Sequence, residues 1–323
     1  MKRRQFIASS ALLSPLALHA QAAFPSKPVK LVVPYPAGGA PDVVARALAE
    51  RLTTTWGQQV VVDNKPGAGT TVAASFVARA PGDGHTLYMT TSAHTIAASV
   101  YKKIDFDPVK DFAALSLLVK VPIVLVTNPA LPAKTLPELI ALAKARPQGL
   151  TFASPGNGTA QHLAGEMFKV QTQAPLTHVP YRGDAPAVTD LLAGQVDTMF
   201  ATLTAVLPHI ASGKLHAVAL ANSKRVERVP ELRTFSETGV AGVVGFEAAT
   251  WFGVLAPATL PPSLRMQISD QIIKLVGEPA MRQRLVDLGG EVVNNTPAEF
   301  DTFMQAETRK WREAVRVSGA TVD

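Results

Sequence analysis

The sequence predicts an α/β protein built from two domains. Short apolar runs of strand length alternate with longer segments of helical period through most of the chain. Strands separated by helices imply parallel sheets with right-handed crossover connections. The length of 323 residues corresponds to about two domains of roughly 150 residues each. A hydrophobic share of 47% against 17% charged residues indicates a packed protein rather than a disordered chain.

The first 22 residues have the pattern of an export signal. Three cations, Lys2-Arg3-Arg4, precede an apolar stretch from Ile7 to Ala20, and Ala20-Gln21-Ala22 forms a cleavage site of small residues. The apolar stretch is shorter than the roughly 20 residues of a membrane span. Arg3-Arg4 resembles a twin-arginine signal, but Lys2 replaces the usual Ser or Thr, so that route and the general secretory route both stay open. We expect a periplasmic protein that is cleaved near Ala22.

The mature chain is only weakly basic. The leader contains three of the 31 Lys and Arg residues and no acidic residue, so 28 basic residues remain against 25 acidic ones. These charges are mixed in sign along helical stretches and form no basic stripe interleaved with aromatic side chains, which argues against a nucleic-acid partner. The absence of Cys excludes disulfides, thiolate metal sites and a Cys nucleophile.

A strand–loop–helix unit begins the mature part of the chain and is then repeated. Residues 29–33 are an apolar run of strand length, and a helix is predicted for 41–56 because Val44, Leu48 and Leu52 share one face. Further strands are predicted at 59–62, 86–90, 150–153, 176–179 and 198–200, and further helices at 70–80, from 159, from 184 and at 204–212.

Two segments are predicted to cross between the domains. The apolar run 121–126, followed by Asn128-Pro129, is typical of a strand that leaves one domain for the next, and 246–255 provides a return. The first domain is then discontinuous. It comprises residues 24–123 plus 247–323, and residues 124–246 form the inserted domain. The C-terminal part is predicted as helices at 261–276, 279–288 and 297–317 around one short strand.

A glycine-rich loop lies between the first strand and the first helix. Glycines let the backbone approach a ligand closely, and the first N–H groups of a helix lack partners, so this loop is predicted to bind an anion. Asp42 offers a structural alternative, because its carboxylate can cap the helix itself. The candidate ligand-binding residues of this loop are Tyr35, Ala37, Gly38, Gly39, Ala40 and Asp42.

A second loop of this kind follows a strand of the inserted domain, and two such loops facing each other would form a cleft. Its candidate residues are Ser154, Gly156, Gly158 and Thr159. The structural alternative is a tight turn with Thr159 as the helix cap. Gln161 stands where a dinucleotide fingerprint needs its third glycine, and no Walker lysine follows, so no cofactor is expected.

A third strand-to-helix loop contains the candidates Tyr181, Gly183 and Asp184. Tyr181 can pack on a ligand. Asp184 is either a plain N-cap or an acceptor for an ammonium or hydroxyl group of the ligand. Ser92 and His94 follow the third strand and add a hydroxyl and an imidazole, although a lone His is more often a structural residue.

Common enzyme motifs are absent from the sequence. It contains no G-x-S-x-G elbow, no H-E-x-x-H helix and no EF-hand loop, and its His residues are not at metal-ligand spacing. We therefore expect no metal and no catalysis, while a triad assembled from residues distant in sequence stays open.

Several strings together resemble the solute-binding receptors of tripartite tricarboxylate transporters, the Bug family, over essentially the whole mature chain. They are Pro34-Tyr35-Pro36-Ala37-Gly38-Gly39, Asn64-Lys65-Pro66-Gly67-Ala68-Gly69, Gly156-Asn157-Gly158-Thr159 with His162-Leu163-Ala164-Gly165-Glu166, His178-Val179-Pro180-Tyr181-Arg182-Gly183, Asp190-Leu191-Leu192-Ala193-Gly194-Gln195-Val196-Asp197 and Trp251-Phe252-Gly253.

The resemblance implies a two-lobed periplasmic binding protein of the Venus flytrap type. Each lobe would be a mainly parallel sheet flanked by helices, and two crossing strands would join the lobes. The resemblance also implies that a small carboxylated metabolite binds between the lobes, with one carboxylate held by backbone N–H groups of the first loop and by ordered water. Membrane permease components would be its partners, and we expect a monomer.

Three places depart from the family pattern, and they affect the identity of the ligand. These are the segment Ser92-Ala93-His94, the pair Ala201-Thr202 and the residue Asp184, so Thr202 joins the candidate ligand-binding residues. Two other functions stay open at this point. One is an exported sensor subunit that presents its closed form to a signalling partner, and the other is an exported enzyme that acts on small organic acids.

Overall fold

The structure, a computed structural model, describes residues 24–320, so the predicted leader lies outside the described residues. The first part of the chain folds into β1 (Val29–Val33), α1 (Ala40–Trp56), β2 (Val60–Asn64), the 3₁₀ turn η1 (Ala68–Thr70), α2 (Thr71–Ala78), β3 (Thr86–Thr91), α3 (Ser92–Val100) and β4 (Phe112–Thr127). The middle part contains α4 (Leu136–Ala145), β5 (Leu150–Ser154), α5 (Ala160–Thr172), β6 (Leu176–Pro180), α6 (Asp184–Leu192), β7 (Thr198–Thr202), α7 (Leu203–Ala211), β8 (His216–Leu220) and η2 (Ser236–Thr238). The last part contains β9 (Ala249–Pro257), α8 (Pro262–Gly277), α9 (Pro279–Asp287), β10 (Glu291–Val292) and α10 (Pro297–Ser318).

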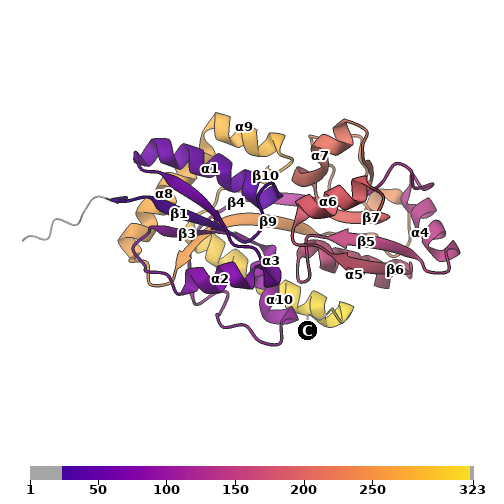
Figure 1. The fold of residues 1–323 in the computed structure, drawn as a ribbon, viewed down its shortest axis with the longest axis horizontal. Coiled ribbons are helices and arrows are strands. Elements are labelled where there is room, and N and C mark those ends of the chain that lie inside the picture. The colour runs from indigo at the N-terminus through magenta and orange to yellow at the C-terminus, as the bar shows by residue number, and fades with distance from the viewer. Residues whose placement is uncertain (1–23, 321–323) are drawn as a thin grey trace, which may run out of the picture.

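Two sets of parallel strands are joined through β4 and β9. β1 lies parallel to β2 and β3, and β5 lies parallel to β6 and β7. β4 pairs with β9 from Phe112 to Pro122 and then with β7 and β8 from Ile123 to Thr127. The sheet order is therefore β2-β1-β3-β9-β4-β7-β5-β6, with β8 and β10 also paired to β4. Figure 1 shows β4 and β9 running through the middle of the molecule between the two sets.

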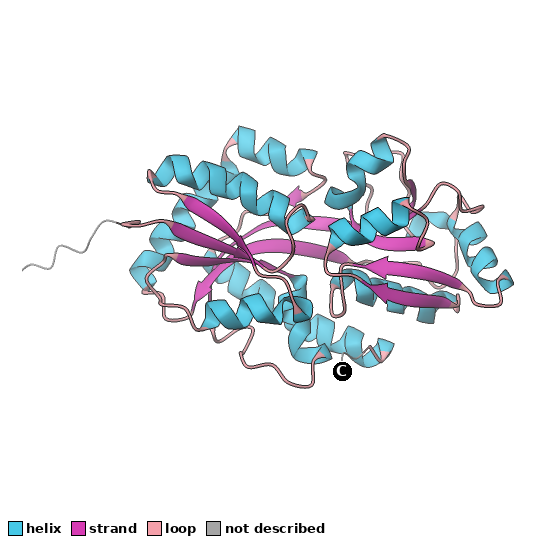
Figure 2. Cartoon of the chain, viewed as in Figure 1, coloured by secondary structure: helices cyan, strands magenta, loops and turns pink. Residues whose placement is uncertain are grey.

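Helices cover both faces of these sheets (Figure 2). This arrangement confirms the predicted α/β class, because helical crossovers return β1, β2 and β3, and likewise β5, β6 and β7, in the same direction. The sheets are mixed rather than mainly parallel, since β4 and β9 pair antiparallel with their neighbours. The predicted crossing strand at 121–126 is the second part of β4, which starts earlier than predicted, at Phe112. The exact boundaries of the two lobes stay a prediction.

The helix α10 packs across both strand sets. It contacts α3, β4 and α5, which come from different parts of the chain. Its residue Phe300 is buried beside Trp251 of β9, whereas Trp311 belongs to the apolar cluster that contains Phe152 and Phe200. Glu307 accepts hydrogen bonds from both indoles, at 2.9 Å from Trp251 Nε1 and 2.7 Å from Trp311 Nε1. One carboxylate oxygen thus connects apolar clusters of the two strand sets.

Some elements were not visible in the sequence pattern. The sequence pattern predicts no helix for residues 92–100, but they form α3, whose N-cap Thr91 accepts a hydrogen bond from the N–H of Ala93. The helix is buried along most of its length, so its residues show no polar face. Within residues 24–320, none of the helices combines the length and the apolar character that crossing a membrane requires.

Candidate functional site

The first loop leads directly into the N-terminus of α1. Gly39 is the N-cap, with φ −76°, and no side chain caps the helix there. Asp42 instead lies in the first turn, where its carboxylate accepts hydrogen bonds from the N–H of Gly38 at 2.9 Å, from Arg46 Nε at 2.8 Å and from Asn64 Nδ2 at 2.9 Å. Burial alone would raise the pKa of Asp42, but the hydrogen bonds from Arg46, Gly38 and Asn64 together lower it. Asp42 therefore braces the loop, as the structural alternative proposed, although from inside the helix rather than at its N-cap.

The second loop is held by its own polar side chains. Thr159 is the N-cap of α5, accepting from the N–H of His162 at 3.2 Å and donating to the carbonyl of Gly156 at 2.7 Å. Gly156 and Gly158 have φ of 138° and 73°, values that glycine adopts far more readily than other residues. Ser154 Oγ lies 2.6 Å from His178 Nε2. The polar side chains of Ser154 and Thr159 therefore shape the turn.

The third loop lies against the first. Gly183 has φ 124°, and a Cβ added there would lie 3.1 Å from Cδ of Pro36 in the first loop. Gly183, not Asp184, is the N-cap of α6, so of the two alternatives for Asp184 the plain N-cap is wrong. The hydroxyl of Tyr181 donates to Asp190 Oδ2 at 2.7 Å, and burial together with this acidic neighbour raises the pKa of Tyr181 to about 12.

A pocket of about 360 Å³ opens where loops of both strand sets meet. The loops after β1, β2, β5 and β6 line it, which places it at the carboxyl ends of the parallel strands, the usual position of ligand sites in such sheets. Of the predicted residues, Tyr35, Gly156 and Tyr181 line the pocket. The predicted residues Ala37, Gly38, Gly39, Ala40, Asp42, Ser92, His94, Ser154, Gly158, Thr159, Gly183, Asp184 and Thr202 are not among its lining residues.

Sequence reasoning missed part of this lining. The segment 66–70 and the residues Tyr101, Asn157 and Arg182 also line the pocket. Arg182 is exposed, so its guanidinium is accessible at this position. The turn 64–69 follows a strand, as the other loops do, and this position could have indicated that it lines the ligand site. Tyr101 carried none, because it ends a helix that the pattern did not reveal.

Asp184, a neighbour of the pocket-lining residue Tyr35, is a buried acidic side chain. Asp184 is 4% exposed, and its Oδ2 accepts from Thr202 Oγ1 at 3.3 Å. Its Oδ1 makes no hydrogen bond of normal geometry within the described chain, and neither do Thr90 Oγ1 and Thr204 Oγ1. Burial raises the pKa of Asp184 to about 6, although Thr202 and the nearby N–H groups of Ala40 and Thr202 oppose that shift.

Tyr35 connects Asp184 with the pocket. Burial raises the pKa of its phenol, a hydrogen bond with Thr91 opposes the rise, and the negative charge of Asp184 adds to it. Tyr35 is thus an electrostatic neighbour of Asp184 and also a lining residue of the pocket. The N-terminal residue Ala40 of α1 and the first residue of α6 consequently face the same buried region.

His94 and Ser92 point elsewhere. The ring of His94 is stacked on Phe106 at 5.6 Å between ring centroids, and its Nε2 lies 2.8 Å from the carbonyl oxygen of Pro108. Burial lowers its pKa to about 4. Ser92 Oγ lies 2.8 Å from Thr250 Oγ1 of β9. His94 therefore has a structural role, which was the alternative to a ligand contact.

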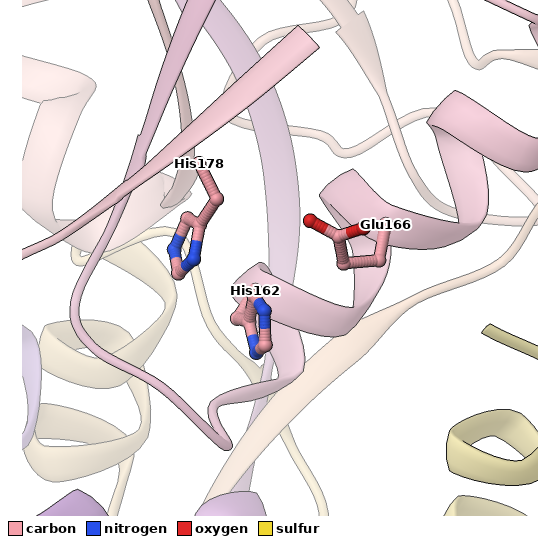
Figure 3. Close-up of side chains that lie close together, drawn as sticks. All are labelled: His162, Glu166 and His178. Atoms are coloured by element: carbon pink, nitrogen blue, oxygen red, sulfur yellow. The ribbon is translucent and has the colours of Figure 1, made fainter. Parts of the chain in front are cut away.

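A second cluster brings together side chains that the sequence spacing did not associate. Figure 3 shows His178 of β6 above His162 of α5, with Glu166 further along α5. Their potential metal-binding atoms lie within 4.8 Å of one another. However, the two imidazoles stack at 4.2 Å and 19°, and Glu166 pairs with Lys169 at 2.8 Å. The nitrogen lone pairs of an imidazole lie in the plane of its ring. In two stacked rings the lone pairs therefore point in parallel directions and do not converge on one metal ion.

Comparison with known proteins identifies the family. The family model "Tripartite tricarboxylate transporter family receptor" matches residues 44–319. The chain belongs to this receptor family. It is a solute-binding receptor of the periplasmic binding protein class, and the family consists of binding proteins rather than enzymes. The predicted resemblance is therefore confirmed.

Several known proteins are similar to this chain over almost their whole length. Protein BugT of Bordetella pertussis is 35% identical over 98% of this chain and 95% of its own. The structure of Rpa4515 from R. palustris, solved with adipate, is 32% identical with a TM-score of 0.89 and covers 93% of this chain and 100% of that one. MatC from Rhodopseudomonas palustris, solved with bound malate, is 31% identical with a TM-score of 0.85 and covers 90% and 100% of the two chains.

Proposed function

We propose that this receptor captures a small carboxylate between its two lobes and delivers it to the membrane components of a tripartite transporter. The pocket of about 360 Å³, lined by loops from both strand sets, is the observation that carries this proposal. Two similar proteins of solved structure hold adipate and malate, and these ligands support a small carboxylate for this pocket.

The chemistry around the pocket suits an anion. The N-terminus of α1 has no side-chain cap at Gly39. Pro41 carries no N–H and the N–H of Ala40 lies near the carboxylate of Asp184, so the N–H groups of Gly39 and Asp42 are the donors proposed for the ligand. A helix N-terminus contributes about 0.3–1 kcal/mol and each charge-assisted hydrogen bond about 1.5–3 kcal/mol. Micromolar affinity requires about 8 kcal/mol net, so a few such donors on each lobe suffice after the cost of association. Arg182 at the pocket adds a cation for a second carboxylate.

We further propose that residues 24–123 plus 247–323 and residues 124–246 move as two lobes. The change of pairing partners within β4 at Ile123 supports this division. A ligand that contacts both lobes favours the closed form, because only that form offers all its donors at once. Export through the leader, with cleavage near Ala22, would place the receptor in the periplasm with the rest of its class.

The proposal is tested with the mature protein after unfolding and refolding to remove bound metabolites. Isothermal titration with mono-, di- and tricarboxylates of three to eight carbons is expected to give micromolar binding for at least one of them, with a raised melting temperature. Native mass spectrometry of the protein before unfolding identifies a retained ligand. Binding by no carboxylate would contradict the proposal, and turnover of the bound acid would favour an exported enzyme.

A further inference from the structure

A buried acidic side chain in the cleft region, Asp184, has one oxygen without a hydrogen-bond partner of normal geometry, although the N–H groups of Ala40 and Thr202 lie close enough to stabilise its charge. Asp184 is 4% exposed, and only Oδ2 has a partner of normal geometry, Thr202 Oγ1 at 3.3 Å. Oδ1 has none within residues 24–320. A buried carboxylate without a partner costs free energy, so a residue of this kind is retained where another molecule completes it. Capping does not explain it, since Gly183 is the N-cap of α6.

The position of Asp184 places it opposite the proposed carboxylate site. Its neighbour Gly183 lies against Pro36 of the first loop, and the N–H of Ala40 at the start of α1 is close enough to influence its pKa. The negative charge of Asp184 adds to the raised pKa of Tyr35, which lines the pocket. The donors at the start of α1 and the acceptor Asp184 therefore lie side by side, one on each lobe.

We propose that Asp184 determines ligand specificity by accepting a hydrogen bond from an ammonium or hydroxyl group that the ligand carries next to the carboxylate held at the N-terminus of α1. This rests on the proposed function. An α-amino or α-hydroxy carboxylate places an anion and a donor a few bonds apart, which matches the adjacent donors and acceptor. A plain dicarboxylate brings an anion beside Asp184 without a donor, so like charges repel and Oδ1 stays unpartnered.

The test compares matched ligands on the refolded mature protein. Calorimetric dissociation constants are measured at pH 8 for three sets of acids, each with a plain, a 2-hydroxy and a 2-amino member: succinate, malate and aspartate; glutarate, 2-hydroxyglutarate and glutamate; adipate, 2-hydroxyadipate and 2-aminoadipate. In each set that binds, we expect a 2-hydroxy or 2-amino member to bind at least tenfold more tightly than the plain acid. Equal affinities, or a preference for the plain acid, would overturn the inference and leave the proposed function intact. Binding by none of them would contradict both.

Two variants separate specificity from a structural role. Asp184→Asn keeps the size of the side chain and removes its charge, and we expect the preference for the donor-bearing ligand to fall to within about threefold. Asp287→Asn removes a carboxylate from the exposed end of α9, where it accepts a hydrogen bond from Gln283, and the preference should not change. If Asp184→Asn weakened all members of a set equally, Asp184 would be structural and the inference wrong. The ratios of dissociation constants measured with the unmodified protein test the inference even if Asp184→Asn fails to fold.

Discussion

Asp42 and Asp184 are acidic residues in the first turns of two helices that follow glycine N-caps. Their surroundings nevertheless shift their pKa values in opposite directions. Hydrogen bonds from Arg46, Gly38 and Asn64 lower the pKa of Asp42 against the effect of burial. At Asp184 burial prevails and raises the pKa to about 6, because no cation among the described residues lies beside it. The first carboxylate is satisfied within the fold, and the second is available to a ligand.

This difference predicts a pH-dependent effect of Asp184→Asn on stability. A carboxyl whose pKa rises from 3.8 to about 6 on folding destabilises the folded state once it is ionised in the unfolded chain. The penalty is absent below about pH 4, grows between pH 4 and 6, and stays constant above that range. At about 1.4 kcal/mol per pKa unit, Asp184→Asn is expected to raise the free energy of unfolding by up to ~3 kcal/mol at pH 8 and by little at pH 4.

Denaturant unfolding of the ligand-free protein at pH 4, 6 and 8 checks this expectation. Asp287→Asn serves as the control, because this side chain lies at the exposed end of α9. A gain in stability that is the same at pH 4 and pH 8 would show that ionisation of Asp184 does not destabilise the folded state.

At the scale of elements, the N-terminus of α1 is the feature on which anion binding depends. Gly39→Pro removes one N–H, and the observed φ of −76° lies within the range of proline, so the helix is expected to persist. Loss of one charge-assisted hydrogen bond, about 1.5–3 kcal/mol, corresponds to a roughly 10- to 100-fold weaker affinity for the carboxylate that binds the unmodified receptor.

Gly39→Ala is the matched control, since it keeps the N–H. A Cβ at this position meets Pro36 O at 3.6 Å and Pro41 Cδ at 3.9 Å, both ordinary contacts. Calorimetry should find the affinity of Gly39→Ala within about threefold of the unmodified protein. Unchanged affinity in Gly39→Pro would mean that the start of α1 does not bind the ligand.

At the scale of the whole molecule, α10 ties the two strand sets together through Glu307. This side chain is 8% exposed and receives the indole N–H groups of Trp251 and Trp311 on one oxygen. Glu307→Ala leaves two buried donors unpaired, at about 1–3 kcal/mol each, so we expect a loss of about 2–6 kcal/mol in the free energy of unfolding.

Glu307→Gln keeps an oxygen acceptor at the same place and should lose less than half as much. Both values come from denaturant unfolding of the ligand-free protein. Equal losses in the two variants would indicate that the charge of Glu307, with its neighbour Lys310 at 3.6 Å, matters more than the two indole hydrogen bonds.

The sequence by itself determined most of the strands and helices and the loops that join them, although it predicted none of α3, α4 and β8. Those signals are local: the apolar run at 29–33 is β1, and glycine followed by Pro41 marks the start of α1. Helices that are buried on most sides, such as α3, escaped this reasoning because they lack a polar face. The strings that resemble the receptor family were also local, and they identified the family correctly.

Only the tertiary structure decided which of these residues meet. Sheet order brings the loops after β1, β2, β5 and β6 to one pocket, stacks His162 on His178, turns His94 into the core and leaves Asp184 buried with one free oxygen. The physical reason is that burial and pairing depend on groups far apart in the chain. An acidic residue in a helix's first turn predicts a capping role in both cases, but only the fold shows that Asn64 of β2 joins Arg46 in satisfying Asp42 and that burial leaves one oxygen of Asp184 without a partner.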